Sequence, residues 1–311
     1  MGHINQRIAY GETLVELGRD NKSIVVLDAD LCASTMGKLF EEAYPDRHIE
    51  VGIAEANMVS IGAGLAFTGK IPFINSFAVF AAGRTFDQIR QSVCIGKVNV
   101  KIVGSSAGLS DFGDGATHQS VEDIAIMRAL PNMTVICPAD ANETVAATKA
   151  IAAFDGPVYL RINRNDLKNV TNEDEPLMIG KPKLMRDGSD VVVFATGITV
   201  GLALEAAMKL EGKVSVRVVN ISTIKPLDKE QIMTLAQGCK AIVCAEEHSV
   251  IGGLGSAVAE AMGSNPKPMK FVGINDIFGC SAHNYQDLLE HFGITSKAIA
   301  FAVQNIAKEA L

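Results

Sequence analysis

Long uncharged apolar runs are missing from this 311-residue sequence. No stretch of about 18 or more such residues occurs, which excludes a conventional membrane-spanning helix. The N-terminal stretch MGHINQRIAYGETL has no apolar signal core, and its Met-Gly start lacks the later Ser or Thr of a myristoylation signal. We therefore expect a cytoplasmic protein that does not bind a membrane.

Concentrated positive charge is missing as well. The chain has 28 Lys and Arg against 35 Asp and Glu, for a net charge of −7, and no basic block. This balance argues against nucleic acid as a partner. The six cysteines form no CxxC pair and the six histidines have no zinc-ligand spacing. We interpret the cysteines as reduced, mostly buried thiols and assign no metal site to them.

Short β-branched runs alternate with stretches of helical periodicity along the whole chain. The expected strands of the first part are 23–30, 48–55, 70–76, 99–106, 133–140 and 157–164. The expected helices of this part are 4–19, 56–68, 120–130 and 141–153. This alternation predicts an α/β fold with parallel sheets that helices cover on both faces.

The periodicity lapses in a polar stretch that contains Pro and Gly, and strand and helix patterns resume after it. We predict a first domain at 1–165, a linker at 166–187 and a second domain at 188–311. The result is two consecutive parallel-sheet domains. Ligands of open α/β sheets bind beyond the carboxyl ends of the strands. Most polar residues at such ends belong to the first domain, so we expect the chemistry there.

An acidic residue and two phenylalanines in the first domain can each be interpreted as structural or as functional. Glu55 lies at the junction of an expected strand and a Gly- and Ala-rich helix. It could cap that helix, or it could be a buried acid whose pKa is set by its pocket. Phe77 and Phe80 stand out in a chain with 5% aromatic residues. They could be core residues or a stacking surface.

A glycine-rich loop at 104–123 leads into an expected helix. Asp114 and His118 lie in this loop, where catalytic groups concentrate, although they could also be solvated polar residues. Ser120 with Asp123 matches a capping box at the start of the helix.

Four segments in this order resemble the second half of transketolases: PDRHIEVGIAEANMVSIGAGLAF, FDQIR, GDGATHQSVEDIAIMRALPNMTVICPAD and TIKPLD. The resemblance runs from about Arg7 to the C-terminus. It implies a pyrimidine-binding domain, then the Rossmann-like transketolase C-terminal domain, with thiamine diphosphate as the cofactor.

The resemblance also implies which residues contact the cofactor. Glu55 matches the glutamate that hydrogen-bonds N1′ of the aminopyrimidine and thereby activates it. Phe80 matches the aromatic that stacks on the pyrimidine, with Phe77 beside it. Asp30 and Leu31 match residues that border the cofactor.

Sugar-binding positions follow in the same way. Asp114 and His118 match the pair that contacts sugar hydroxyls near the reacting carbon, which makes His118 a catalytic candidate. Arg7, Ser34 and Arg164 match phosphate-binding positions, and the planar fork of Arg suits phosphate.

One position departs from the family. Ser106 stands where the family usually has a phosphate-binding His. A serine hydroxyl can donate a hydrogen bond but brings no positive charge. This substitution implies that the distal end of the sugar is bound differently.

The letters around Asp114 also match the Gly-Asp-Gly that opens the metal and diphosphate motif of thiamine-diphosphate enzymes, and Asn142 could close it. However, Asp114 is expected in a long loop rather than at a strand end. We therefore assign no metal to this chain, and we interpret the partial G-x-G at Gly253 and Gly255 as close helix–strand packing.

This pattern predicts one subunit of a split transketolase that transfers ketol units between sugar phosphates. An N-terminal partner subunit would supply the diphosphate site and the Mg²⁺ or Ca²⁺, in an α2β2 assembly. The alternatives are the β subunit of a 2-oxo acid dehydrogenase, a deoxyxylulose-phosphate-synthase-like enzyme and a non-catalytic scaffold. The GDGATHQ loop and TIKPLD favour transketolase.

Overall fold

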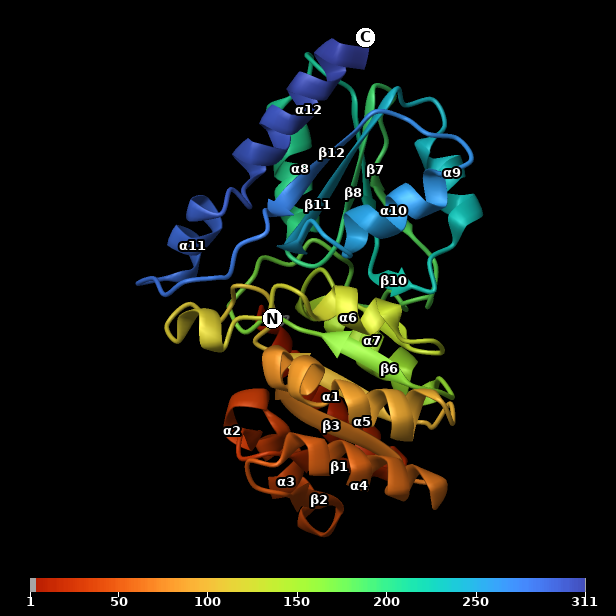
Figure 1. The fold of residues 1–311 in the computed structure, drawn as a ribbon, viewed down its shortest axis with the longest axis vertical. Coiled ribbons are helices and arrows are strands. Elements are labelled where there is room, and N and C mark those ends of the chain that lie inside the picture. Colours follow the sequence, from red (N-terminus) through yellow and green to blue (C-terminus); the bar gives the residue numbers. More distant parts are fainter. Residues whose placement is uncertain (1–3, 311) are drawn as a thin grey trace.

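Two β-sheets flanked by helices follow one another along the long axis of the molecule (Figure 1). This computed structural model describes residues 4–310. The first sheet has the strand order β10-β5-β6-β4-β3-β1-β2, and the second has the order β12-β11-β8-β9-β7. The prediction of an α/β protein with two successive sheets is confirmed.

The strands of the first sheet are β1 (Ile24–Asp28), β2 (His48–Glu50), β3 (Ile71–Phe77), β4 (Lys101–Ser105), β5 (Thr134–Ile136), β6 (Val158–Arg161) and β10 (Thr223–Lys225). Its α-helices are α1 (Gln6–Asp20), α2 (Cys32–Thr35), α3 (Gly37–Ala43), α4 (Glu55–Phe67), α5 (Phe86–Gln88), α6 (Asp123–Ala129) and α7 (Ala141–Ala153). Short 3₁₀ or π segments are η1 (Pro45–Arg47), η2 (Val79–Arg84), η3 (Ile89–Cys94) and η4 (Gly115–Thr117).

The strands of the second sheet are β7 (Lys183–Arg186), β8 (Val191–Ala195), β9 (Val216–Asn220), β11 (Ala241–Ser249) and β12 (Met269–Ile274). Its helices are α8 (Thr199–Lys209), α9 (Lys229–Ala236), α10 (Leu254–Met262), α11 (Tyr285–His291) and α12 (Ser296–Ala310). In Figure 1, α8 and α12 lie on one side of this sheet and α9 and α10 on the other.

Both sheets are mostly parallel, as predicted, and each carries one antiparallel strand at its edge. In the first sheet β10 pairs antiparallel with β5, and in the second β7 pairs antiparallel with β9. Strand β7 lies within the expected linker 166–187, and β10 comes from the expected second domain although it joins the first sheet. Both strands are too short, at three or four residues, to produce a recognisable alternation of apolar and polar residues in the sequence.

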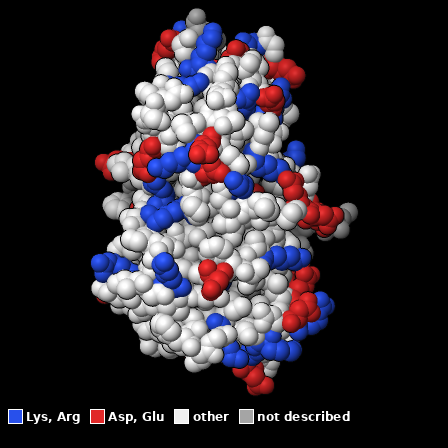
Figure 2. Space-filling model, turned by 90° about the vertical axis from the view of Figure 1, so that its right-hand side faces the viewer, with Lys and Arg blue, Asp and Glu red and all other residues white. Residues whose placement is uncertain are grey.

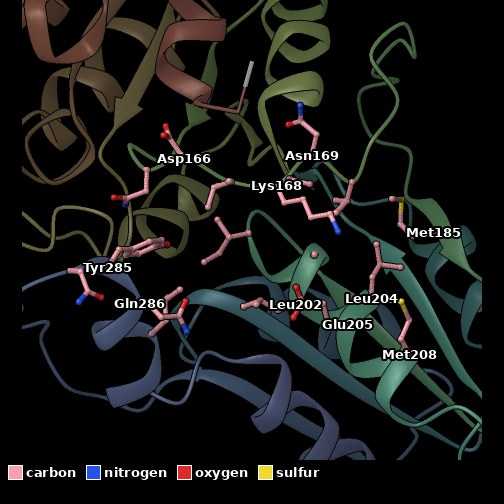
Figure 3. Close-up of a pocket in the computed structure, with 18 of the residues that line it drawn as sticks. Asp166, Lys168, Asn169, Met185, Leu202, Leu204, Glu205, Met208, Tyr285 and Gln286 are labelled. Carbon is pink, nitrogen blue, oxygen red and sulfur yellow. The ribbon is translucent and has the colours of Figure 1, made fainter. Parts of the chain in front are cut away.

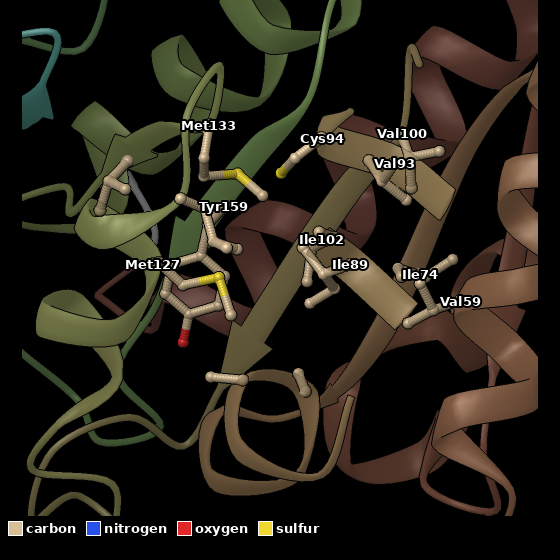
Figure 4. Close-up of a cluster of buried hydrophobic side chains, with 14 of the residues drawn as sticks. Val59, Ile74, Ile89, Val93, Cys94, Val100, Ile102, Met127, Met133 and Tyr159 are labelled. Carbon is tan, nitrogen blue, oxygen red and sulfur yellow. The ribbon is translucent and has the colours of Figure 1, made fainter. Parts of the chain in front are cut away.

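The first sheet is buried on both faces. Helices α1, α3 and α7 contribute apolar side chains to one face, while α4, α6 and η3 contribute to the other. Figure 4 shows this second cluster, in which Ile74 and Ile102 from neighbouring strands meet Val59, Ile89 and Val93. Close packing of this kind fixes the strands, and hence the polar residues at their carboxyl ends.

The surface carries both signs of charge. Figure 2 shows acidic and basic side chains interspersed on one face, with a wide uncharged area between them. None of the helices within residues 4–310 combines the length and the apolar character needed to cross a bilayer.

Candidate active site

Glu55 is the first residue of α4, but its side chain does not cap that helix. Residue Ala54 occupies the N-cap position. The Glu55 side chain is buried, with 2% exposure, and both of its carboxylate oxygens accept from Nη1 of Arg84, at 3.0 and 2.8 Å. Of the two interpretations from sequence, the structure therefore agrees with the buried acid.

Three rings lie together near this carboxylate. Phe77, at the end of β3, is buried, and Phe80, in η2, is half-buried. Their centroids are 6.2 Å apart and their planes differ by 16°. The ring of His118 meets both edge-on, at 5.4 Å from Phe80 and 6.2 Å from Phe77. The Arg84 guanidinium, 4.7 Å from the Phe80 centroid, joins these rings to Glu55.

The loop that carries Asp114 and His118 is held in place by the second domain. Gln119 is buried and donates from Nε2 to the backbone carbonyl of Cys280, at 2.9 Å. The Ala282 N–H donates to the carbonyl of Phe112 at 2.9 Å. Asp114 itself is exposed and His118 is half-buried. The loop is therefore anchored by hydrogen bonds to the second domain, while its two polar side chains remain at least partly exposed.

The expected phosphate-binding residues also come together. Nη1 of Arg7 donates to the Ser34 carbonyl at 2.7 Å, and its Nη2 donates to the Arg164 carbonyl at 3.2 Å. Burial and the neighbouring charge of Arg164 lower the pKa of Arg7. Sequence analysis missed Asp111, whose Oδ2 lies 2.5 Å from Nη1 of Arg164. No motif marked Asp111, although it begins the loop segment DFGDGATHQ.

Three buried hydroxyls lie at the same sheet edge with no hydrogen-bond partner among the described residues, those of Ser76, Ser105 and Ser106. Ser106 also has a φ of +54°, which is uncommon for a residue other than glycine. Unsatisfied buried polar groups and strained backbone are both enriched at functional sites. The described residues therefore leave the hydrogen-bonding capacity of these three hydroxyls unused.

Asp30 and Leu31 follow β1 at this edge. Asp30 is exposed with a φ of +59°, and its N–H donates to Oε1 of Glu50 at 2.8 Å. Leu31 is half-buried and occupies the N-cap position of α2. Neither has a direct polar or ring contact with Glu55 or Phe80 among the described residues.

The expected capping box at Ser120 and Asp123 was wrong. Helix α6 begins at Asp123, with Glu122 at its N-cap and no side-chain cap bond. The Asp123 carboxylate instead accepts from Nε of Arg161 and from the hydroxyl of Tyr159, both at 2.8 Å. A fully buried guanidinium needs a counter-charge, and this requirement outweighs a helix cap.

A second carboxylate in the interior joins the two domains. Oε1 of Glu247 accepts from the Leu109 N–H at 2.8 Å and from the Tyr285 hydroxyl at 2.7 Å. Burial raises the pKa of Glu247 to about 7 despite the nearby charge of Arg161. Its Oε2 also accepts from Nδ2 of Asn163 at 3.4 Å, so Glu247 links residues of the first domain to β11 and Tyr285.

The preceding residue of β11, Glu246, is also hydrogen-bonded within the protein. Glu246 accepts from the N–H groups of Leu254 and Gly255 at 2.7 and 2.8 Å, and burial raises its pKa to about 7. A Cβ on Gly253 would stand 1.9 Å from Oε2 of Glu246, and one on Gly255 would stand 2.4 Å from the Phe271 ring. The interpretation of this G-x-G as close packing is confirmed.

Asn142 has no contact with Asp114. Its Nδ2 donates to the Thr171 carbonyl at 2.8 Å, so it anchors the segment between the domains. Within residues 4–310, no group of three or more His, Cys, Asp or Glu side chains is arranged to hold a metal ion.

A cavity of about 870 Å³ lies between the interdomain segment, α8 and α11 (Figure 3). Its labelled lining includes Lys168, Leu202, Glu205 and Tyr285. None of the residues predicted for the site lines it, so the site described above is distinct from this cavity.

The fold and the carboxylate–aromatic cluster define a two-domain α/β protein with its polar site on the first sheet. The sequence matches the family models described as "Transketolase, pyrimidine binding domain" over residues 3–169 and "Transketolase, C-terminal domain" over residues 180–299. The chain therefore belongs to the transketolase family. This membership implies thiamine diphosphate as the cofactor and transferase chemistry.

Individual relatives agree with this family assignment. The chain is 45% identical over 308 residues to a "Putative transketolase C-terminal section" of Methanocaldococcus jannaschii, covering 97% of this chain and 96% of the relative. It is 44% identical to a "6-deoxy-6-sulfo-D-fructose transketolase subunit SqwH" of Clostridium sp., covering 97% and 94%. A solved structure called "Split gene transketolase, inactive beta4 tetramer" is 46% identical, with a TM-score of 0.90 and full coverage of both chains. The predicted correspondence to the C-terminal half of transketolase is confirmed.

Proposed function

We propose that this chain is the C-terminal subunit of a two-subunit transketolase that moves a two-carbon ketol unit between sugars. The observation that carries the proposal is the cluster of Glu55 with the rings of Phe77, Phe80 and His118. A buried carboxyl beside an aromatic face is the environment that a neutral aminopyrimidine requires. Thiamine diphosphate supplies the carbon nucleophile when it is bound.

Each residue of this cluster has a task in the proposal. Glu55 hydrogen-bonds N1′ of the aminopyrimidine, and its burial keeps water from competing for that bond. Phe80 stacks on the ring with Phe77 behind it. Asp30 and Leu31 border the cofactor at the end of β1. Together these residues would hold and orient the pyrimidine end of the cofactor.

The sugar lies along the loop and the strand ends. Asp114 and His118 bind hydroxyls near the reacting carbon, and His118 also moves protons there. The position of His118 supports this role. Its half-buried imidazole packs edge-on against Phe80, and the imidazole Nδ1 lies 2.9 Å from the hydroxyl of Thr117. Imidazole suits proton transfer near neutral pH.

Arg7, Ser34, Ser106 and Arg164 bind the distal end of the sugar. Asp111 offsets part of the positive charge there, because it already pairs with Arg164. We propose that the distal group is anionic, a phosphate or a sulfonate, and that it shares Arg164 with Asp111. The name of the Clostridium relative, which specifies a sulfonated sugar, supports a sulfonate as a candidate.

The other half of the site belongs to a partner in this proposal. An N-terminal transketolase subunit would bind the diphosphate through Mg²⁺ or Ca²⁺, and two copies of each chain would form a cytoplasmic α2β2 enzyme. The relatives named as a C-terminal section, a subunit and a split-gene protein support this arrangement. The 2-oxo acid dehydrogenase, deoxyxylulose-phosphate-synthase-like and scaffold alternatives have no relative among these three.

The test is a ketol-transfer assay with thiamine diphosphate and Mg²⁺. The chain is purified alone and together with the product of a neighbouring gene that encodes the Gly-Asp-Gly…Asn half. We expect activity only from the pair. Activity of the chain alone would refute the need for a partner, and an inactive but cofactor-binding pair would refute the reaction.

A further inference from the structure

Arg84 makes the two contacts that the proposed function assigns to the aminopyrimidine. Its Nη1 donates to the carboxylate of Glu55 at 2.8 and 3.0 Å. Its guanidinium lies 4.7 Å from the centroid of the Phe80 ring. A guanidinium is planar, carries N–H donors and packs against aromatic faces. It is therefore chemically similar to the ring that would bind there.

The two partners of this ion pair differ in their freedom to move. The side chain of Glu55 is 2% exposed, whereas that of Arg84 is 49% exposed. Arg84 is also the last residue of η2, a π-helical segment. Such wide turns are rare and occur frequently at functional sites. The exposed arginine can swing into water, while the buried carboxylate cannot.

Arg84 and the aminopyrimidine would compete for the same two groups, the Glu55 carboxylate and the Phe80 ring. A carboxylate that accepts from Arg84 with both oxygens has limited capacity for a second donor in the same direction. An aminopyrimidine that bonded Glu55 and stacked on the same side of Phe80 would meet the guanidinium, which already lies 4.7 Å from the ring centroid. Both contacts must be given up or shared before the cofactor can use them.

We propose that Arg84 is a displaceable stand-in for the aminopyrimidine, which holds Glu55 and covers Phe80 until the cofactor is loaded. This inference rests on the proposed function. Arg84 stabilises the chain before loading, because a buried carboxylate without a counter-charge is destabilising. It also weakens the apparent affinity for the cofactor, because only the fraction of molecules with Arg84 displaced can bind.

The test uses Arg84→Met, which keeps the length and apolar stem of the side chain but removes the charge. Thiamine diphosphate binding is measured by calorimetry on the reconstituted pair with Mg²⁺, and thermal unfolding is measured on the chain alone. We expect the dissociation constant to fall about tenfold, as for a competent fraction near one in ten. We expect the unfolding temperature of the chain alone to fall at the same time. Arg90→Met, at an exposed arginine near Arg84, is the matched control and changes neither.

Tighter cofactor binding combined with lower stability distinguishes a stand-in from a structural support, whose loss would lower both affinity and stability. If Arg84→Met weakens or leaves unchanged the cofactor affinity, the inference is wrong. If the wild-type pair itself binds no thiamine diphosphate, the proposed function fails, which is a different result. The wild-type pair provides a second readout that needs no variant. Side-chain NMR should show the Arg84 guanidinium immobilised before cofactor addition and mobile after it, and an unchanged signal would contradict the displacement.

Discussion

The carboxyl edges of the two sheets carry similar polar residues in opposite states. At the end of β11, Glu246 and Glu247 are fully buried, and each accepts hydrogen bonds from backbone N–H groups. At the ends of β3 and β4, the hydroxyls of Ser76, Ser105 and Ser106 have no partner among the described residues. The satisfied edge joins the two domains, whereas the hydroxyls of the other edge have hydrogen-bonding capacity that the described residues do not use. All of these polar groups are buried, so hydrogen-bond satisfaction distinguishes the two edges where burial does not.

The largest expected effect is on the functional side of this comparison. Glu55→Gln should reduce ketol transfer by the reconstituted pair by about a thousandfold, because general acid–base groups contribute at this order. The fold should persist, because glutamine has nearly the same volume. Steady-state rates and circular dichroism measure the two effects.

The matched control is Glu143→Gln. Glu143 is another buried glutamate in the first turn of a helix, but it accepts from Asn220 and Ser222 across the domain boundary. We expect this variant to lose stability and keep the turnover of its folded fraction. Equal loss of turnover in both variants would mean that Glu55 has no special role in the reaction.

The second prediction concerns stability and the buried ion pair of Arg161 with Asp123. Arg161→Met should lower the free energy of unfolding by about 3–5 kcal/mol, because it leaves Asp123 buried without its counter-charge. The ion pair has side-chain exposures of 5% and 0%, so solvent screening is small. Urea denaturation monitors the change. A loss of less than about 1 kcal/mol, as for a surface pair, would show that this joint is not essential.

A third prediction concerns pH. The pKa values of Glu246 and Glu247 are raised to about 7 from 4.5, chiefly by burial, so the folded state holds these protons more tightly than the unfolded state. The associated stability is fully present below pH 4.5 and is lost as the pH rises through about 7. Each group contributes about 3 kcal/mol across this window.

Glu247→Gln tests this assignment, because a glutamine does not titrate and can still accept from Leu109 and Tyr285. Unfolding free energies at pH 5 and pH 8 should differ less in this variant than in the wild type, by about the contribution of one group. An unchanged difference would mean that Glu247 does not titrate in this range.

The smallest effect is expected at the distal end of the sugar. Asp111→Asn removes the carboxylate that pairs with Arg164 and leaves the guanidinium free for the substrate anion. KM for a phosphate-ended ketose should fall about tenfold, the equivalent of 1.4 kcal/mol, which is within the range for one charged hydrogen bond. A ketose without an anionic end should show no change. Equal changes for both sugars would place Asp111 outside the distal site.

Sequence patterns predicted the architecture and most of the residues that the structure brings together. Periodicity predicted buried strands such as β3 and β4, and motif resemblance proposed Glu55, Phe80 and His118, which the structure brings together through Arg84 and ring contacts. It missed β7 and β10, because three- or four-residue edge strands leave no period to detect. It also missed Arg84 and Asp111, because an ion pair between residues far apart in sequence has no local signature. The capping-box error has the same origin, since the Asp123 carboxylate at the start of α6 pairs with Arg161 at the end of β6.

The measurement that tests the central claim most directly is equilibrium binding of thiamine diphosphate with Mg²⁺. Calorimetry is performed on the chain alone, on its pair with the N-terminal subunit, and on the pair with Glu55→Gln. Our account predicts saturable binding to the pair, much weaker binding to the Glu55→Gln pair and none to the chain alone. Binding to the pair that is indifferent to Glu55→Gln would contradict it, because the edge of the first sheet would then not hold the cofactor.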